Sequence, residues 1–257
     1  MAERELEKLY YDIVDRQSCD ECSRQLGVFR PGLMNESSDK RVMLIFEGPG
    51  GGDKEEENQR SGRKYKEVED ALLKVDEAIK QRDMKTIVRE SQRGFDHYWV
   101  RNVQRKFFTS LFRTLAEKNV IDVEIEEVDS YVERGKYWKD FFITDAALCP
   151  GKRRTLKEAV SKCQSYLGRQ ITIFEGSSPK LIIPFGGYAL SSIVNLRGIP
   201  RERPKKATIT ELHGRLFPYD KFFVIPLLHP SRMYMTLRDS YFQYFREGLS
   251  ALSGSST

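Results

Sequence analysis

The 257-residue sequence has few of the residues that often mark a protein's class: four cysteines, three histidines and two tryptophans. It has no apolar run near the roughly 20 residues of a membrane-spanning helix, so we expect no membrane partner. Its first residues, MAERELEKLYYDIV, are too charged for a secretory signal peptide. We therefore expect a protein of the reducing cytoplasm, where a pair of disulfides is not expected.

Two further features are absent. The sequence has no internal repeat, and the glycine-rich stretch at 48–52 is not followed by the Gly-Lys-Ser/Thr of a phosphate-binding loop. Hydrophobic residues make up 39% of the chain and charged residues 32%, which suits one α/β domain with a full core. The net charge of +5 agrees with a polyanionic partner, although many proteins without such a partner share it.

Four apolar runs are typical of strands buried on both faces: 41–46, 141–143, 181–185 and 222–228. Segments with helical periodicity surround them, at 2–17, 64–119, from 155 onwards, 188–196 and 236–252. Strands separated by helices predict a parallel sheet covered on both faces. The stretch 120–125 is ambiguous between a loop and an extra strand.

Polar or glycine residues follow each predicted strand. Glu47, Asp145 and His229 end three of them, and Gly186 with Gly187 ends the other. Because the carboxyl ends of parallel strands meet at one edge, these residues should converge there. Glu47 is followed by glycines and a proline, a backbone that a ligand can approach closely, although a plain solvent loop explains this stretch equally well.

His97 and His213 have no comparable setting in the sequence, and we assign them structural roles.

The four cysteines form the second constellation. Cys19 and Cys22 are separated by two residues, a spacing that lets one turn direct both sulfurs at a metal. Cys149 follows Asp145 by four residues, and Cys163 lies two turns into the next predicted helix. The sequence therefore predicts one site of four thiolates, which suits either zinc or an iron–sulfur cluster.

A basic trio, Lys152, Arg153 and Arg154, connects Cys149 to this helix. Thr155 followed by Glu158 predicts a capping box at the helix N-terminus. A second basic loop, at 197–208, is a further candidate for phosphate contacts.

Taken in order, these motifs resemble the iron–sulfur (family-4-like) uracil-DNA glycosylases. The order is CxxC, strand with Glu-Gly-Pro-Gly, strand with Thr-Asp-x-x-x-Cys, helix with Cys, strand with Gly-Gly, and strand with His-Pro-Ser. The resemblance covers residues 1–60 and 140–250. It implies a three-layer αβα sandwich with a four-stranded parallel sheet, as one domain of residues 1–257 with a helical insertion at about 64–139.

The resemblance also implies a cofactor and a partner. A structural [4Fe–4S] cluster, with zinc as the alternative, would be bound by Cys19, Cys22, Cys149 and Cys163. The cluster would order the loop that carries Lys152, Arg153 and Arg154 against the DNA backbone. The partner would be DNA containing a damaged base, and we expect a monomer.

Site roles follow from the same resemblance. His229 would hydrogen-bond the base carbonyl where negative charge grows, and Glu47 would position water or stabilise the sugar cation. Gly48, Pro49 and Gly50 would lie against the substrate, and Asp145 stands where the family has the asparagine that reads uracil. Ser231 and Arg232 would enter the minor groove, with Met233 or Tyr234 as a wedge.

The chain departs from the family pattern at three points. Asp145 replaces an asparagine, and an ionised aspartate can only accept hydrogen bonds. Phe46 replaces the usual glycine, and the stacking phenylalanine has no counterpart, Tyr65 being the nearest aromatic residue. We expect a glycosylase for uracil or another deaminated base. The alternatives are an inactive glycosylase-like iron–sulfur protein that binds nucleic acid or a partner, and an unrelated four-cysteine metalloprotein.

Overall fold

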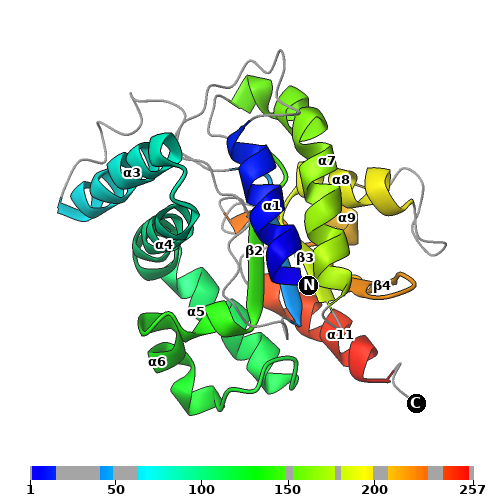
Figure 1. Cartoon of the computed structure of the whole chain (residues 1–257). Helices are drawn as coiled ribbons and strands as arrows, with labels where there is room; N and C mark the ends of the chain where they lie inside the picture. The colour runs from blue at the N-terminus through cyan, green and yellow to red at the C-terminus, as the bar shows by residue number, and fades with distance from the viewer. Residues whose placement is uncertain are drawn as a thin grey trace.

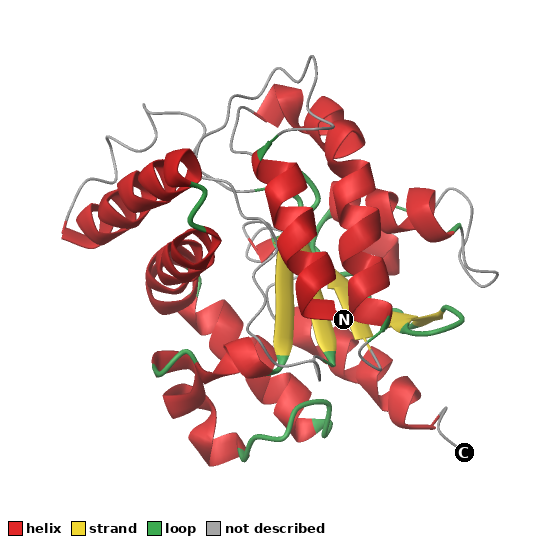
Figure 2. Cartoon of the chain, in the orientation of Figure 1, coloured by secondary structure: helices red, strands yellow, loops and turns green. Residues whose placement is uncertain are grey.

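A five-stranded sheet forms the centre of the protein (Figures 1 and 2). The structure is a computed structural model, which describes residues 2–15, 41–48, 63–148, 153–176, 181–198, 208–230 and 240–254. The strand order is β2-β1-β3-β5-β4. The strands are β1 (Val42–Phe46), β2 (Phe141–Asp145), β3 (Leu181–Pro184), β4 (Phe217–Pro218) and β5 (Phe223–Val224). All neighbouring pairs are parallel except β4 with β5.

Helices cover both faces of this sheet. One face is covered by α1 (Ala2–Val14), α7 (Leu156–Glu175) and α8 (Gly187–Arg197), and α3 (Arg63–Gln81), α4 (Met84–Phe95) and α9 (Ile209–Leu212) add to the same core. The other face is covered by α5 (Arg105–Glu117), α6 (Val128–Glu133) and α11 (Tyr241–Gly254). The three-layer αβα sandwich predicted from the sequence is therefore confirmed.

Burial on both faces explains the unbroken apolar strands. Met43 and Ile45 of β1 face the core beneath α1 and α7, whereas Val42 and Leu44 face the core beneath α5. Successive side chains of a strand point to opposite faces, so a strand between two helical layers needs apolar residues at every position. All five residues of β1 are buried accordingly.

Two local predictions were wrong, and one open alternative was resolved. The sheet gains the short antiparallel strand β4, because Phe217 and Pro218 pair with Phe223 and Val224 in a hairpin too short to show periodicity. Residues 120–125 form no strand; the chain there is irregular and leads into the 3₁₀ turn η2 (Ile125–Glu127).

The capping box assigned to Thr155 is the second wrong prediction. Thr155 is the N-cap residue of α7, but a 3₁₀ turn, η4 (Arg153–Thr155), precedes the helix and no side-chain capping hydrogen bond forms. Helix α9 has a capping box that the sequence analysis did not predict. Its Thr208 and Glu211 side chains each accept a hydrogen bond from the other residue's backbone N–H.

The predicted helical stretch from 64 to 119 is helical throughout most of its length. Between α4 and α5 the backbone forms a π-helix, η1 (Asp96–Val103). Phe95, Phe107, Leu111 and Leu115 are buried in the core on the α5 side of the sheet. The division into one domain with an insertion stays a prediction.

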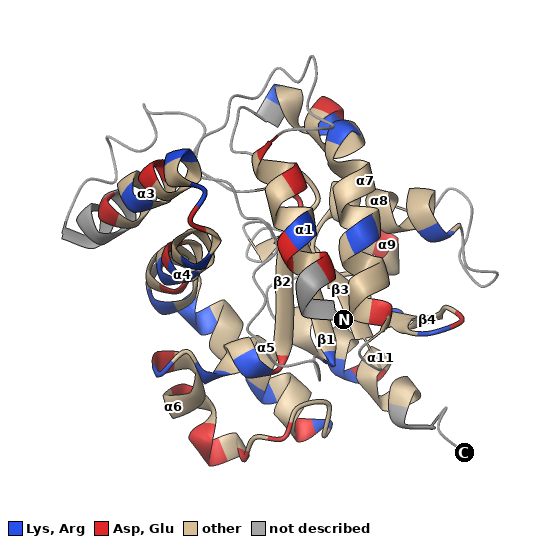
Figure 3. Cartoon of the chain, viewed as in Figure 1, with Lys and Arg blue, Asp and Glu red and all other residues tan. Residues whose placement is uncertain are grey.

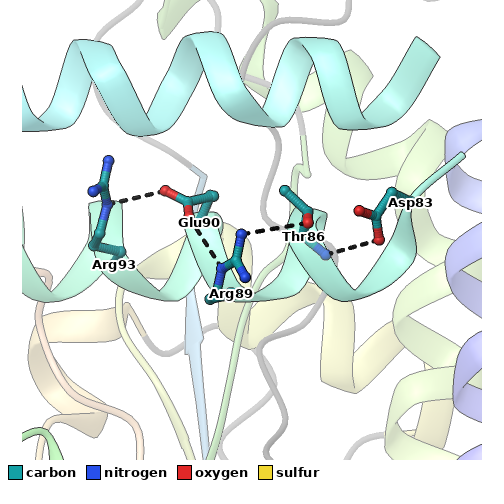
Figure 4. A network of polar contacts seen from close by, with 5 residues as sticks. All are labelled: Asp83, Thr86, Arg89, Glu90 and Arg93. Atoms are coloured by element: carbon teal, nitrogen blue, oxygen red, sulfur yellow. Dashed lines mark hydrogen bonds and ion pairs between the residues drawn. The ribbon is translucent and has the colours of Figure 1, made fainter. Parts of the chain in front are cut away.

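A network on α4 fixes basic side chains at the surface (Figure 4). Glu90 is buried, and its two carboxylate oxygens form ion pairs with Arg89 Nε at 3.1 Å and Arg93 Nε at 3.0 Å. Asp83, the N-cap residue, accepts a hydrogen bond from the N–H of Thr86. Figure 3 shows that Lys, Arg, Asp and Glu positions are distributed along outer helices such as α3 and α4. None of the described helices is long and apolar enough to cross a bilayer.

Candidate active site

The carboxyl ends of four parallel strands meet at one edge and are joined by backbone hydrogen bonds. The N–H of Ala147, just after β2, donates to the carbonyl of Glu47 at 3.1 Å. The N–H of Gly186, just after β3, donates to the carbonyl of Leu227 at 2.8 Å. The sheet order therefore sets Asp145, Glu47, Gly186 and the segment of His229 side by side, as the strand pattern predicted.

Glu47 lies half-buried between the ends of β2 and β3. Its Oε1 accepts the N–H of Tyr188 at 3.2 Å, in the first turn of α8. Gly186 has φ +98°, and a Cβ atom there would overlap the carboxylate of Glu47. The glycine at the end of β3 thus provides the space that the Glu47 side chain occupies, and the N-terminus of α8 supplies a dipole that favours a negative group.

Gly48 continues this close contact. A Cβ on Gly48 would meet the carbonyl oxygen of Ala147 at 3.3 Å and Leu156 Cδ1 at 3.2 Å. The segment after Glu47 is thus packed directly against the one that leads from β2 towards Cys149. The proposed catalytic and metal-binding segments share this contact.

Asp145 is the last residue of β2, opposite Phe46 of β1, and is 1% exposed. It is the single charged residue within the described strands. Burying a carboxylate costs free energy that an apolar residue at a strand end would not incur. The role of Asp145 towards a base stays a prediction.

His229 emerges half-buried from the chain that extends β5. Its ring contacts that of Phe46 edge to face, with centroids 6.4 Å apart. Phe46 in turn stacks on Phe185 at 4.6 Å. Phe46, which the sequence analysis noted in place of a glycine, therefore packs between the His229 ring and the Phe185 ring.

The separation of Glu47 and His229 follows from the sheet. They belong to β1 and to the extension of β5, with β3 between them. At about 4.8 Å per strand, their backbones are about 10 Å apart across the sheet. Gly186 ends the strand between them, and the Glu47 carboxylate fills the space that a Cβ there would take. The sheet thus places a carboxylate and an imidazole at the same edge, two strands apart.

Two buried residues beside His229 were not found from the sequence. His213 is 5% exposed, and its Nδ1 accepts the N–H of Leu228 at 3.1 Å. Tyr241 is fully buried and donates its hydroxyl to the carbonyl of Leu228 at 2.6 Å. No local pattern signals them, because the contacts join residues 13 and 15 positions apart in the sequence.

Cys163 is the one predicted metal ligand within the described residues. It is 4% exposed, and its Sγ accepts the N–H of Leu148 at 3.5 Å. Because Cys149 follows Leu148 directly, the fold brings the chain on either side of the basic trio together. Amide donation to sulfur is typical of metal-bound thiolates, so the surroundings of Cys163 fit such a centre.

The end of α1 approaches the same helix. Asp12 forms an ion pair with Arg169 of α7, and its carbonyl accepts the hydroxyl of Tyr166 at 3.2 Å. Figure 1 shows α1 and α7 running in opposite directions, so the C-terminal end of α1 lies towards the turn that holds Cys163. The described end of α1 therefore lies on the Cys163 side of Tyr166. Within the described part of the chain no cluster of three or more His, Cys, Asp or Glu side chains could hold a metal.

Several predicted site residues are not described. Outside the described residues lie Cys19, Cys22, Pro49, Gly50, Cys149, Lys152, Ser231 and Arg232. Tyr65 lies in α3 and Arg153 in η4, but their side chains are likewise outside the description. Arg154 is exposed at the start of α7. Their roles stay predictions.

Comparison with known proteins agrees with this geometry. No match was found among the curated proteins. The family model of the uracil DNA glycosylase superfamily matches residues 36–253, which include every strand and all the strand ends described above. The chain therefore belongs to the uracil DNA glycosylase superfamily.

Proposed function

We propose that this protein is a DNA glycosylase that hydrolyses the N-glycosidic bond of uracil or another deaminated base in DNA. The observation that carries the proposal is the placement of Glu47 and His229 at one sheet edge, on either side of Gly186. Membership of the superfamily supports a DNA glycosylase-like function in general. A base in a duplex must first be flipped out of the stack to reach such an edge.

The reaction develops two opposite charges. As the glycosidic bond breaks, positive charge grows on the sugar and negative charge on the departing base. His229, held against Phe46, would donate a hydrogen bond to the base carbonyl, where the negative charge accumulates. Glu47, on the other side of Gly186, would orient the attacking water or stabilise the sugar cation.

The base itself would meet Asp145. Uracil offers a carbonyl O4 and an N3–H, and an asparagine can donate to the first while accepting from the second. Ionised Asp145 can only accept, so it favours a base that presents two N–H groups or an amino group at this position. Xanthine and hypoxanthine, the deaminated purines, are therefore tested alongside uracil.

The test is base release from oligonucleotides carrying uracil, hypoxanthine or xanthine, in single- and double-stranded form. Glu47→Gln and His229→Ala should each reduce release by about 100-fold or more, while DNA affinity stays nearly unchanged. No release from any of these substrates, with DNA still bound, would overturn the proposal and favour the non-catalytic alternative.

We further propose that Cys19, Cys22, Cys149 and Cys163 bind a [4Fe–4S] cluster. Support comes from the burial of Cys163, from the Leu148 amide at its sulfur and from the approach of α1 to α7. When bound, the cluster would supply structural order and no step of the hydrolysis. Zinc suits four thiolates as well.

Metal content decides between the two. Anaerobically purified protein should be brown and contain about four iron and four sulfide per chain by this proposal. Cys163→Ser should lose this iron and the visible absorbance, and the change should appear without any assay of activity. A colourless protein with one zinc per chain would contradict the cluster.

A DNA-backbone contact at the basic trio is the last part of the proposal. Arg154 is exposed in η4, the turn that follows the loop between Cys149 and α7. Replacing Lys152, Arg153 and Arg154 together by glutamine should weaken binding equally for all DNA sequences and reduce its salt dependence. An unchanged salt dependence would exclude this loop from the interface.

A further inference from the structure

Among the described residues, the segment that leads from β5 to His229 pairs with another strand on one side only. Beyond β5, the chain continues alongside β3: the N–H of Leu227 donates to the carbonyl of Pro184 at 2.9 Å, and Leu227 pairs with Phe185 in a parallel bridge. Backbone groups of a strand alternate in direction, so those of Pro226 and Leu228 point away from β3. The antiparallel strand β4 pairs only with Phe223 and Val224, so it does not extend alongside Pro226 and Leu228.

Side chains and a turn satisfy these outward groups in place of another strand. The carbonyl of Pro226 accepts the N–H of Gly214 at 2.9 Å, and Pro226 has no N–H to satisfy. The N–H of Leu228 donates to His213 Nδ1 at 3.1 Å, and the carbonyl of Leu228 accepts the Tyr241 hydroxyl at 2.6 Å.

The two side chains are also bonded to each other's segment. His213 Nε2 lies 3.1 Å from the carbonyl oxygen of Tyr241, and the two rings are in contact with centroids 4.3 Å apart. Because Nδ1 accepts from an amide, Nε2 must carry the proton that is donated to this carbonyl. Leu228, His213 and Tyr241 thus form a closed ring of three hydrogen bonds, which we call the Leu228 clamp.

This arrangement demands a neutral imidazole. A protonated His213 would have a hydrogen on Nδ1 facing the N–H of Leu228, and both would be donors. Burial of the ring lowers the pKa of His213 to about 4, partly offset by the hydrogen bond to the Tyr241 carbonyl. At neutral pH the clamp is therefore intact.

We propose that His213 and Tyr241 are positioning residues for His229, acting through both polar groups of the residue that precedes it. The inference rests on the proposed glycosylase function, in which His229 touches the base. Leu228 is held on one peptide group by His213 and on the next by Tyr241, so the direction in which His229 leaves the sheet is set by two buried side chains. Phe46 then restricts the orientation of the His229 ring, since the two ring centroids are 6.4 Å apart.

The clamp directs two buried polar rings at a single residue. An imidazole and a phenol are both buried, at 5% and 0% exposure, to satisfy one residue that lies next to a half-buried histidine. A shift of about 1 Å in a catalytic group can cost about 100-fold in rate. The expected effect of releasing Leu228 is therefore on the rate of the chemical step rather than on DNA binding.

The test removes single hydrogen bonds. Tyr241→Phe deletes the bond to the Leu228 carbonyl and keeps the ring, and His213→Leu deletes both bonds of the imidazole. His213→Asn retains an acceptor close to the Nδ1 position. We expect kcat to fall about 10-fold in Tyr241→Phe and about 100-fold in His213→Leu, with KM unchanged, and His213→Asn to recover part of the loss.

Tyr244→Phe is the matched control. Tyr244 lies on the same helix and its ring faces His213 at 6.2 Å, but it is 42% exposed and is not one of the two side chains that bond Leu228. This variant should keep the wild-type kcat. If Tyr241→Phe and His213→Leu lower the melting temperature while kcat stays within about twofold of wild type, the clamp is structural and the proposal is wrong.

A second readout needs no activity. The chain has three histidines, so the ring C–H signals of His229 can be assigned by NMR with single variants. Tyr241→Phe should change the titration of His229 and speed hydrogen exchange at the Leu228 amide, and Tyr244→Phe should change neither. These changes in a protein that releases no base would uphold the positioning role and reject the proposed function; an unchanged His229 titration would overturn the positioning role itself.

Discussion

The carboxylate of Glu47 occupies the space where a Cβ atom of Gly186 would stand. The two residues come from neighbouring strands, β1 and β3, whose ends are aligned by parallel pairing. Gly186 also has φ +98°, a conformation that other residues rarely adopt. The position and the backbone of this glycine are therefore both tied to the placement of the proposed catalytic carboxylate.

Gly186→Ala should displace Glu47 and strain the backbone. We expect base release to fall by about 10- to 100-fold and the free energy of unfolding to fall by about 1–3 kcal/mol. Base release under single-turnover conditions and thermal unfolding measure the two effects.

Gly187→Ala is the control for stability. A Cβ on Gly187 would meet nothing within 4 Å among the described residues, and the φ of Gly187 is not in the left-handed region. Its melting temperature should match that of wild type. Equal loss of stability in both variants would mean that helix α8 tolerates no side chain at either glycine, irrespective of Glu47.

Asp145→Asn tests base recognition. The amide can donate to the uracil O4 and accept from N3–H, whereas the ionised carboxylate can only accept. We expect kcat/KM for uracil to rise at least about 10-fold in this variant, with a fall for whichever purine the wild type prefers. A fall for uracil would show that Asp145 does not contact the base edge in the expected way.

Asp96 predicts one component of the pH dependence of stability. Burial raises its pKa to about 6 against the opposing charge of Arg101, and Trp138 Nε1 and the Tyr137 hydroxyl both donate to its Oδ1. A raised pKa means that the folded protein binds the proton more tightly than the unfolded chain. Stability from this residue should therefore fall, by at most about 3 kcal/mol, as the pH rises from about 4 to above 6.

His213 predicts the opposite component. Its pKa is lowered by burial to about 4, below the ordinary value of 6.5. The unfolded chain therefore binds this proton more tightly, and stability should fall by about 3 kcal/mol as the pH drops from 6.5 through 4. The two components act in the same range with opposite signs and should largely cancel in the wild type.

Single variants separate them. Denaturant unfolding of Asp96→Asn should show stability rising with pH between 4 and 6.5, the slope of His213 alone. His213→Asn should show stability falling with pH over the same range, the slope of Asp96 alone. Asp122→Asn, at an exposed carboxylate, should leave the wild-type profile unchanged. Identical profiles in all three variants would contradict both assignments.

The sequence by itself determined the layers of the fold. Unbroken apolar runs such as 42–46 and 181–185 are required where helices cover both faces of a sheet, so the runs located four of the five strands. The polar residues that end them, Glu47, Asp145 and His229, fell at one edge because parallel strands share a direction. The short strand β4 was missed because two residues carry no period.

Tertiary structure alone decided what holds those residues. Three contacts join positions that are distant in the sequence. They are the close approach of the Glu47 carboxylate to Gly186, the edge-to-face contact of His229 with Phe46, and the Leu228 clamp. We assigned His213 a structural role because its neighbours in the sequence form no motif. Its hydrogen-bond partners are the backbone N–H of Leu228 and the backbone carbonyl of Tyr241, which is 28 residues further along the chain. Periodicity predicts which face a side chain takes, but a hydrogen bond depends on distances of a few tenths of an ångström, which only the packed chain sets.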